Sequence, residues 1–440
     1  MLHCLRKLWP VIGAPRSSWQ GTRWFWLPAA LLALFWGGGA PAWGAGFALI
    51  QQGTAAMGQG NAFVADASDP SAIYYNPAGL NQIKRAQVYQ ALILNYPDRE
   101  YSGGGLDSQT NHRLYKNLTA YLVIPVHDRV ALGVGFFSPF GMGTAWPPTW
   151  AGRYITTSTS MQTYNLNPVI SVKVLDNLSL AAGVDVLWSR VWLKRKSPTV
   201  VRGQVLADSE VDLKGEGNGV GYNFGLLYEP LSGVKFGASY RSQISVNHTG
   251  NLTITVPSPV PAIPSTPGSA GVVFPPSLTM CVCYSRLTPF TFEFDTTWTG
   301  WSFYKKLKVN LDNPLTLSGV LTPTITTPKN WHDAWAFRFG ANYQVRENMK
   351  IRAGYIYDLT PVPDDSLDPH VPDANRHVFT VGSDLKIKRF TLGIAYNFIL
   401  FESRTKNNTI NFNGVPAILQ ANGRYNSNSH SLGLSWTFQF

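Results

Sequence analysis

The residue types that most often carry catalysis are scattered along this sequence. Eight histidines are present, and seven of them follow residue 44, spread over expected turns, loops and strand ends: His112, His127, His248, His332, His370, His377 and His430. None lies in a HExxH or GxSxG setting, the patterns of a zinc protease and of a serine hydrolase. The sequence therefore predicts no catalytic residue, no cofactor and no enzyme.

Cysteine and aspartate give two weaker signals. Cys281 and Cys283 share one face of a strand but lie too far apart for relaxed disulfide geometry. A single Cys-x-Cys without a second ligand pair does not indicate a metal or redox site, so we expect two apolar strand residues and no metal. Two interpretations stay open, Ca²⁺ ligands or a solvated external loop, for the acidic group Asp364, Asp365, Asp368 and Asp373.

The first element of the chain resembles an export signal. Basic residues precede an apolar run from Trp24 to Trp36, which is shorter than the ~20 residues of a membrane span and fits the h-region of a signal peptide. Small residues in Ala42-Trp43-Gly44 suit a signal peptidase. We expect residues 1–44 to be removed and Ala45 to begin the mature chain; an uncleaved anchor is the alternative.

Removal of residues 1–44 takes four of the 36 basic residues and none of the 25 acidic ones, which leaves a net charge of +7. An exported protein rarely meets nucleic acid, so the basic excess indicates lipopolysaccharide phosphates or anionic substrates as partners, or a scattered excess without a role. No stretch of eighteen apolar residues follows the signal, which excludes a helical membrane protein.

Alternating runs with short and long breaks follow Lys84. They predict fourteen strands, joined alternately by tight turns and longer loops: 85–97, 111–126, 130–139, 153–175, 178–196, 219–229, 234–247, 277–286, 290–304, 332–345, 349–359, 376–387, 390–403 and 425–440. An even strand number with short turns on one side is the requirement of an outer-membrane barrel, whose closure satisfies every backbone group in lipid.

The last strands show which face meets lipid. One face is large and apolar throughout, with Leu432, Leu434, Trp436, Phe438 and Phe440 in the last strand and Phe390, Leu392, Ile394, Tyr396, Phe398 and Leu400 in the strand before it. A soluble sandwich also alternates, but it does not usually place its largest apolar residues outward or end on Phe. We also expect a Pro-rich loop over 248–276, interpreted either as an apolar docking surface or as a stiff extended loop.

Residues 45–84 have neither a strand's period nor a helical stripe. Asn76 before Pro77 predicts a sharp turn and one short helical turn. This segment resembles the hatch of the FadL family of outer-membrane transporters for long-chain fatty acids and aromatic hydrocarbons. The matching residues are Ala45-Gly46-Phe47, Gly60-Asn61-Ala62-Phe63 and Tyr75-Asn76-Pro77-Ala78-Gly79-Leu80.

Three further stretches extend the resemblance along the chain. They are Pro139-Phe140-Gly141 with Trp150–Tyr154 and Asn165–Pro168, Leu178–Leu180 with Gly183 and Trp188-Ser189-Arg190, and Arg352–Tyr355 with Thr360–Asp364 and Pro372–Arg376. The resemblance implies a 14-stranded antiparallel transmembrane β-barrel over residues 85–440 in the outer membrane of a Gram-negative type of cell. It further implies a plug over residues 45–84 inside the lumen, after the signal at 1–44.

The resemblance also implies roles for individual residues in passive capture and sideways release of a hydrophobic compound. Phe47, Leu49 and Ile50 would sense the ligand. Arg190 would hold its carboxylate, with Arg153 and Lys194 as comparable candidates. Asn76, Pro77 and Ala78 would form the constriction of the hatch, and Gly133, Gly135 and Pro139 would kink or end a strand at a lateral opening.

The expected partners are a hydrophobic small molecule, outer-membrane lipid and lipopolysaccharide, and the outer-membrane assembly machinery, which reads a terminal Phe such as Phe440. Two other functions remain as alternatives, a general diffusion porin for small polar solutes and a surface adhesin with a soluble sandwich. The sequence does not distinguish a fatty acid from an aromatic hydrocarbon as cargo.

Overall fold

The structure is a computed structural model that describes residues 46–201, 204–317, 320–410 and 420–440. The expected signal, residues 1–44, lies outside the described residues, as does Ala45. All described residues belong to one structural unit, residues 40–440. In this described part, no helix has the length and the apolar character that crossing a membrane requires.

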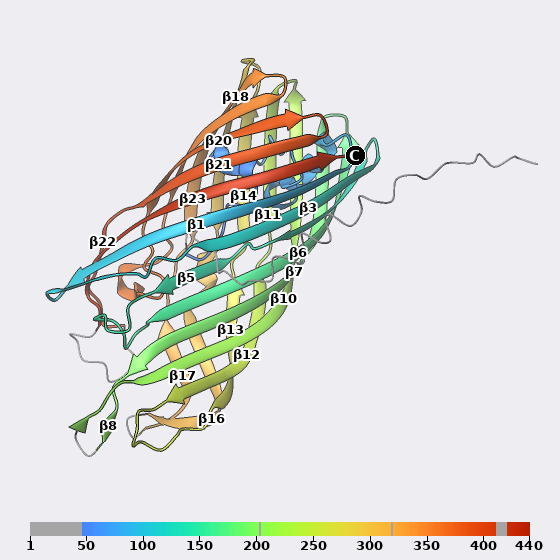
Figure 1. The fold of residues 1–440 in the computed structure, drawn as a ribbon. Coiled ribbons are helices and arrows are strands. Elements are labelled where there is room, and N and C mark those ends of the chain that lie inside the picture. The colour runs from blue at the N-terminus through green and yellow to red at the C-terminus, as the bar shows by residue number, and fades with distance from the viewer. Residues whose placement is uncertain (1–45, 202–203, 318–319, 411–419) are drawn as a thin grey trace, which may run out of the picture. The chain divides into compact units, whose positions relative to one another are not determined.

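One antiparallel sheet closes on itself into a fourteen-strand barrel (Figure 1). The first and last wall strands close it, because β1 (Gln87–Gly103) pairs with β23 (Gly423–Gln439) from Gln87↔Gln439 to Ser102↔Arg424. A closed sheet pairs its backbone groups within the wall, the condition for a sheet that spans lipid. The predicted fourteen-stranded barrel is confirmed.

Seven wall positions hold one strand and seven hold two strands in succession. The single strands besides β1 and β23 are β6 (Ser158–Leu175), β7 (Leu178–Ser197), β10 (Ser209–Leu231), β19 (Met349–Asp358) and β20 (Arg376–Ile387). The double positions are β2 (Leu106–Gln109) with β3 (Tyr115–His127), β4 (Val130–Phe137) with β5 (Gly141–Ala145), β11 (Val234–Arg241) with β12 (Ile244–Thr255), β13 (Thr266–Phe274) with β14 (Ser277–Tyr284), β15 (Phe290–Thr299) with β16 (Lys306–Leu317), β17 (Val320–Pro328) with β18 (Ala334–Arg346), and β21 (Phe390–Phe401) with β22 (Arg404–Lys406).

The two ends of the barrel differ. Tight turns such as 128–129 and 388–389 lie at the end where β23 finishes, which we name the turn end. Longer connections lie at the opposite, loop end; they contain the short strands and 3₁₀ turns β8 (Val200–Val201), β9 (Gln204–Val205), η3 (Trp301–Phe303) and η4 (Asp364–Ser366).

Side chains alternate across the wall as the sequence predicts. In β21, Phe390, Leu392 and Ile394 are 48–50% exposed, whereas Ala395 and Asn397 are buried. The outer face is therefore apolar and the inner face is small or polar, the pattern of a barrel in lipid.

The expected loop over 248–276 is wrong over most of its length. β12 and β13 continue the wall and pair from Ile244↔Phe274 to Leu252↔Thr266, so only residues 256–265 connect them. Pro267 lies near the start of β13, where a strand tolerates a residue without an N–H. The Pro-rich composition hid two wall strands, and the Pro-rich loop is limited to residues 256–265.

Residues 46–83, which we name the inner segment, lie inside the ring of strands, where Figure 1 draws them in blue. They form α2 (Thr54–Gly58), α3 (Ala72–Tyr75) and η2 (Pro77–Gln82). α2 lies against β20 and β21, and η2 against β6, β7 and β10. As expected, the chain is extended at Asn76 (φ −159°) and turns helical at Pro77, where the Asn76 side chain accepts the Ala78 N–H at 3.1 Å.

Inward-facing glycines of the wall make room for the inner segment. A Cβ added to Gly354 would lie 2.3 Å from the Gln59 carbonyl carbon, and one added to Gly382 would lie 2.9 Å from the Gly58 Cα. Similar conflicts with the inner segment arise at Gly133, Gly135, Gly225, Gly237, Gly340, Gly393 and Gly433. Because interiors are close-packed, these glycines, which we name the glycine belt, fit the wall to the segment it encloses.

Candidate functional site

An aromatic pocket at the loop end encloses the side chain of Phe47, which is 1% exposed. Five rings lie 4.6–6.2 Å from its ring, centroid to centroid: Phe140, Phe274, Trp301, Tyr304 and Trp331. Apolar side chains complete this Phe47 pocket, among them Met142, Met161, Leu187, Ile244, Val246 and Val371. Burial of a Phe side chain contributes about 2–3 kcal/mol, so the pocket suits an apolar ring or chain.

Gly46 and Asp373 hold the start of the inner segment. The Gly46 N–H donates to Asp373 Oδ2 at 3.1 Å, and the Thr360 hydroxyl donates to the same oxygen at 2.7 Å. Burial raises the pKa of Asp373. Gly46 has φ +64°, and a Cβ there would lie 2.6 Å from the Trp331 ring, so glycine suits both the backbone and the space at this position.

The backbone on either side of Phe47 forms hydrogen bonds with a wall strand that is interrupted. β4 ends at Phe137 and β5 begins at Gly141. Beside this interruption the Leu49 N–H donates to the Pro139 carbonyl at 2.8 Å, and the Gly141 N–H donates to the Phe47 carbonyl at 2.8 Å. Residues 47–49 thus form a short inserted strand beside the break.

The wall is incomplete next to this inserted strand. The β3–β4 ladder ends at Ala120↔Phe136 although β3 begins at Tyr115, and β5 pairs with β6. We name the region between residues 115–119 and residues 138–145 the β3–β5 gap. Here Asn117 donates to the Gln51 carbonyl at 3.2 Å, so the inner segment covers the gap from inside.

The predicted kink residues occupy two different settings. Pro139 lies in the interruption between β4 and β5. Gly133 and Gly135 lie within β4, in register with β3 and β6, and each would place a Cβ 2.9 Å from the Ile73 side chain. These two glycines therefore belong to the glycine belt, and β4 is continuous where they lie.

A cavity of about 110 Å³ lies between the inner segment and the wall, lined by Ile50, Tyr74, Phe140, Arg241 and Arg338 among others. It is smaller than the ~150 Å³ of an engineered cavity that binds benzene. A long-chain compound therefore does not fit in this cavity as the inner segment lies in the structure.

The cavity holds two arginines that sequence reasoning missed. Arg241 pairs with Asp185 at 2.7 Å and donates to the Ile73 carbonyl at 2.8 Å. Arg338 is buried and donates to the Thr297 hydroxyl. The alternation of residues along the strands could have identified both arginines, because each lies at a position whose side chain faces the inside of the barrel.

The predicted carboxylate ligands lie elsewhere. Arg190 pairs with Glu216 at 3.2 Å, and its side chain is 71% exposed, on the outer face that it shares with Trp188 and Trp192. Lys194 follows on the same face, 4.7 Å from the centre of the Trp192 ring. Arg153 pairs with Asp208 at 2.9 Å in the loop before β6. The structure brings none of the three to the Phe47 pocket.

The predicted hatch residues lie against the wall. The Asn76 side chain is fully buried and donates to the Val64 carbonyl at 2.8 Å and to the Leu226 carbonyl at 3.0 Å. Gly225 faces the same side chain, since a Cβ there would lie 2.4 Å from Asn76 Oδ1. Asn76 thus ties two parts of the inner segment to β10.

The acidic residues at 364–373 were interpreted either as Ca²⁺ ligands or as a solvated loop, and the structure agrees only in part with the solvated loop. Asp368 is buried and pairs with Lys329, and its Oδ1 accepts the His370 N–H at 2.8 Å. Burial alone would raise the pKa of Asp368, but Lys329 and His370 outweigh it and hold that pKa well below its ordinary range. This ion pair fixes the loop that covers the Phe47 pocket.

The comparisons with known proteins agree with this architecture. A family model described as "Outer membrane protein transport protein (OMPP1/FadL/TodX)" matches residues 38–440. The long-chain fatty acid transport protein of Salmonella typhi is 24% identical over 390 residues, 81% of this chain and 88% of the relative.

Two solved structures share the fold. A FadL homologue of Pseudomonas aeruginosa has a TM-score of 0.77 at 22% identity and covers 90% of this chain and 100% of its own. The Pseudomonas putida toluene transporter TodX has a TM-score of 0.72 at 17% identity, with 90% and 100% covered. The match over nearly the whole barrel confirms the resemblance read from the sequence: this chain is an outer-membrane protein of the OMPP1/FadL/TodX transport family.

Proposed function

We propose that this protein takes up long-chain fatty acids or other hydrophobic compounds across the outer membrane by passive binding and lateral release. Support comes from the family, from relatives named as transporters of fatty acids and of toluene, and from the aromatic pocket. No energy source is needed, because transfer of apolar surface from water to the pocket is favourable by about 25 cal/mol per Å².

The observation that carries the proposal is the double attachment of Phe47. Its ring fills the pocket, and its backbone carbonyl accepts the N–H of Gly141 at the broken strand. A ligand that enters the pocket competes with the ring. Loss of the ring then frees residues 47–49, and with Leu49 and Ile50 displaced the β3–β5 gap opens toward the membrane.

The remainder of the inner segment is the plug in this proposal. Asn76, Pro77 and Ala78 stay pinned to β10 and close the lumen below the pocket, so the ligand leaves sideways. A general diffusion porin is less well supported, because the glycine belt holds the inner segment against the wall on many sides. Deletion of residues 46–80 is expected to leave a folded barrel that leaks small solutes.

Two partners belong to the same proposal. The outer-facing Arg190 and Lys194 lie in the half of β7 nearer the loop end, where lipopolysaccharide phosphates would meet them. Phe440 directly follows the last strand, β23, and would serve as a signal for the outer-membrane assembly machinery.

A disulfide across the inserted strand tests the mechanism. Ala48 and Phe140 form an antiparallel bridge pair, so Ala48→Cys with Phe140→Cys, in a Cys281→Ser/Cys283→Ser background, would fix residues 47–49 to the break. In cells without another transporter of this family, oxidation is expected to lower uptake of oleate and of toluene at least ten-fold, and reduction to restore it.

The reduced form of the same variant is the matched control. Equal uptake by the oxidised and reduced forms would overturn lateral release through the β3–β5 gap. Rapid swelling of liposomes in arabinose with the unmodified protein would favour the porin.

A further inference from the structure

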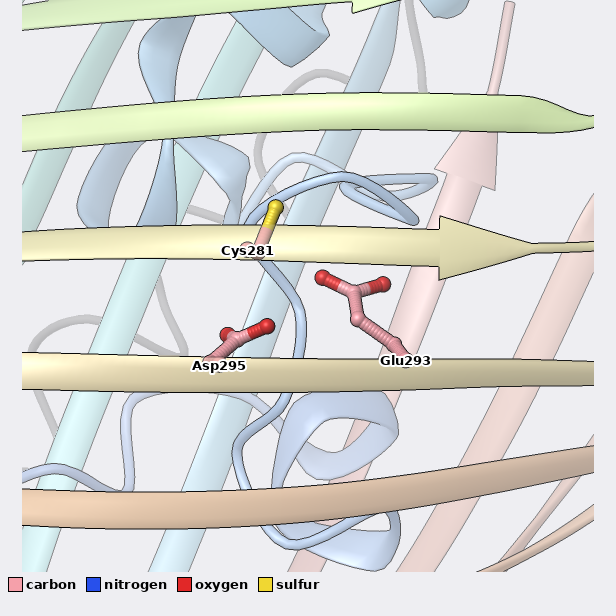
Figure 2. Close-up of side chains that lie close together, drawn as sticks. All are labelled: Cys281, Glu293 and Asp295. Atoms are coloured by element: carbon pink, nitrogen blue, oxygen red, sulfur yellow. The ribbon is translucent and has the colours of Figure 1, made fainter.

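Three buried side chains from two neighbouring strands meet where the wall touches the inner segment (Figure 2). Cys281 of β14 lies directly opposite Asp295 of β15. Glu293 lies two residues before Asp295 in the same strand. The Cys281 sulfur and one carboxylate oxygen from each acid all lie within 4.8 Å of one another. Their exposed fractions are 8%, 0% and 4% for Cys281, Asp295 and Glu293.

The two acids already bind the backbone of the inner segment. Glu293 accepts the N–H groups of Ala65 at 2.7 Å and Asp66 at 2.8 Å, and Asp295 Oδ2 accepts the N–H of Phe63 at 3.1 Å. These hydrogen bonds explain why carboxylates stand at these positions. They leave ligand capacity unused, because each carboxylate oxygen carries two lone pairs.

One oxygen of this group has no hydrogen-bond partner. Asp295 Oδ1 is buried and unpaired, and Figure 2 shows the Asp295 carboxylate directed toward that of Glu293. A buried acceptor without a partner is costly, so this oxygen points to a proton or cation that completes the site.

The neighbouring cations do not supply that partner. Arg338 is the cross-strand neighbour of Asp295 and donates to the Thr297 hydroxyl, while Lys235 donates to Gln82. Arg352 pairs with Asp66 and Asp384. Among the described residues, no ion pair reaches Glu293 or Asp295.

We infer that Cys281, Glu293 and Asp295 form a binding site for a divalent cation of the zinc class. Zinc accepts both thiolate sulfur and carboxylate oxygen, whereas Ca²⁺ and Mg²⁺ take oxygen ligands. Bond lengths of 2.0–2.3 Å place tetrahedral ligand atoms roughly 3.3–3.8 Å apart, so the side chains close by about 1 Å on the ion. Binding releases the thiol proton, and the thiolate with two carboxylates then exceeds the charge of the ion by one.

The ion would fasten the wall to the inner segment. Glu293 and Asp295 would bind it through one set of lone pairs and residues 63–66 through another, so the metal, β14, β15 and the inner segment become one unit. The inference does not depend on what the barrel transports.

Metal binding by the whole protein in detergent tests the site. Protein stripped with EDTA is equilibrated with Zn²⁺, or with Mg²⁺ in parallel, and bound metal is measured by mass spectrometry. We expect about one zinc per chain and no retained magnesium. Co²⁺ in place of Zn²⁺ is expected to give the near-ultraviolet absorption of a cobalt–thiolate bond.

Single substitutions identify the ligands. Cys281→Ser and Asp295→Asn are expected to lower zinc affinity by more than the ten- to 100-fold that loss of an outer-sphere partner costs and, for Cys281→Ser, to remove the thiolate absorption. Cys283→Ser is the matched control, because Cys283 is buried on the same face of β14 and is not part of the proposed site. Heat-modifiable migration on gels verifies that each variant is folded.

Two outcomes would overturn the inference. One is zinc binding by the unmodified protein no tighter than that of Cys281→Ser, which would leave a shared proton between the two acids as their partner. The other is an equal loss in Cys283→Ser.

Discussion

The carbonyl oxygen of Phe47 accepts a hydrogen bond from the N–H of Gly141 at 2.8 Å. The ring of Phe47 fills the aromatic pocket, and Gly141 is the first residue of β5. One residue therefore connects the contents of the pocket to the edge of the interrupted wall strand. Displacement of the ring and loss of this wall contact are coupled, and the coupling has measurable consequences.

Phe47→Ala is expected to raise the affinity for hydrophobic ligands. The ring competes with a ligand for the pocket, and its removal relieves about 2–3 kcal/mol of competing burial, or roughly 30- to 150-fold in affinity. Titration with a fluorescent fatty acid measures the change. Arg190→Gln is the control: its side chain faces outward, so the same titration should stay within two-fold. Weaker binding by Phe47→Ala would show that the ring helps to hold the ligand.

Asp373→Asn is expected to loosen the start of the inner segment. A hydrogen bond to a charged acceptor contributes about 1.5–3 kcal/mol, and the N–H of Gly46 depends on this carboxylate. Hydrogen exchange of residues 46–52, followed by mass spectrometry, should become at least ten-fold faster. Asp364→Asn, an exposed acid of the same loop that pairs with Arg404, should leave this exchange unchanged.

Gly354→Ala tests the glycine belt. The added Cβ would lie 2.3 Å from the backbone of Gln59, and overpacking of this kind costs about 1–3 kcal/mol. The inner segment should shift, and ion conductance in planar bilayers should rise. Gly271→Ala in β13 is the matched control, since no heavy atom lies within 4 Å of its added Cβ. Equal conductance in the two variants would contradict a tight fit.

Acid is expected to release part of the inner segment. Burial alone would raise the pKa of Asp66, but Lys350, Arg352 and Lys235 outweigh it and lower the pKa from 3.8 to about 2. Because the folded pKa is depressed, the stability that Asp66 contributes is present above pH 3.8 and is lost as the pH falls toward 2. Conductance should therefore rise over this window.

Asp66→Asn provides the comparison for the acid experiment. It removes the titrating group, so conductance at pH 5 should already be raised and the further increase below pH 4 should be smaller. An unchanged pH profile in this variant would assign the effect to other acids.

Removal of one partner from the buried ion pair Lys329–Asp368 should open the loop over the pocket. Breaking a buried pair costs up to about 3–5 kcal/mol; Lys329→Met leaves Asp368 with His370 alone, and the loop carries Leu367 and Val371 into the apolar cluster. Limited proteolysis should cut residues 359–375 of Lys329→Met faster than those of the unmodified protein. The double variant Lys329→Met/Asp368→Asn should be cut more slowly than Lys329→Met alone, because no charge is left unpaired.

The wall was predictable because its signal is local. The period of two in strands such as β21 and β23 follows from which face meets lipid. The type of each residue, apolar or polar, therefore indicates its face without knowledge of its partners. Residues 266–274 broke the rule, because the alternation of β13 is weak and prolines lie close to it on both sides.

The site was less predictable because its contacts join distant residues. The pairing of Gly46 with Asp373, or of Phe47 with Gly141, depends on how the inner segment is threaded through a closed barrel, and no local period encodes that path. Arg190 was a candidate through family resemblance. Arg190 alternates in step with the large apolar residues Trp188 and Trp192, which already indicated that it lies on the outer face. The same test of alternation would have selected Arg241 as an inward-facing arginine.

The seam between β1 and β23 has a consequence for biogenesis. Gln87 meets Gln439 only after every strand between them exists, and residues 46–83 must sit against bare glycine positions of strands from both halves of the chain. The final pairing of β1 with β23 therefore encloses the inner segment. This step is expected to be slow, because its partners are remote in sequence. In the complete chain, the inner segment must therefore enter the barrel before β1 and β23 finish pairing.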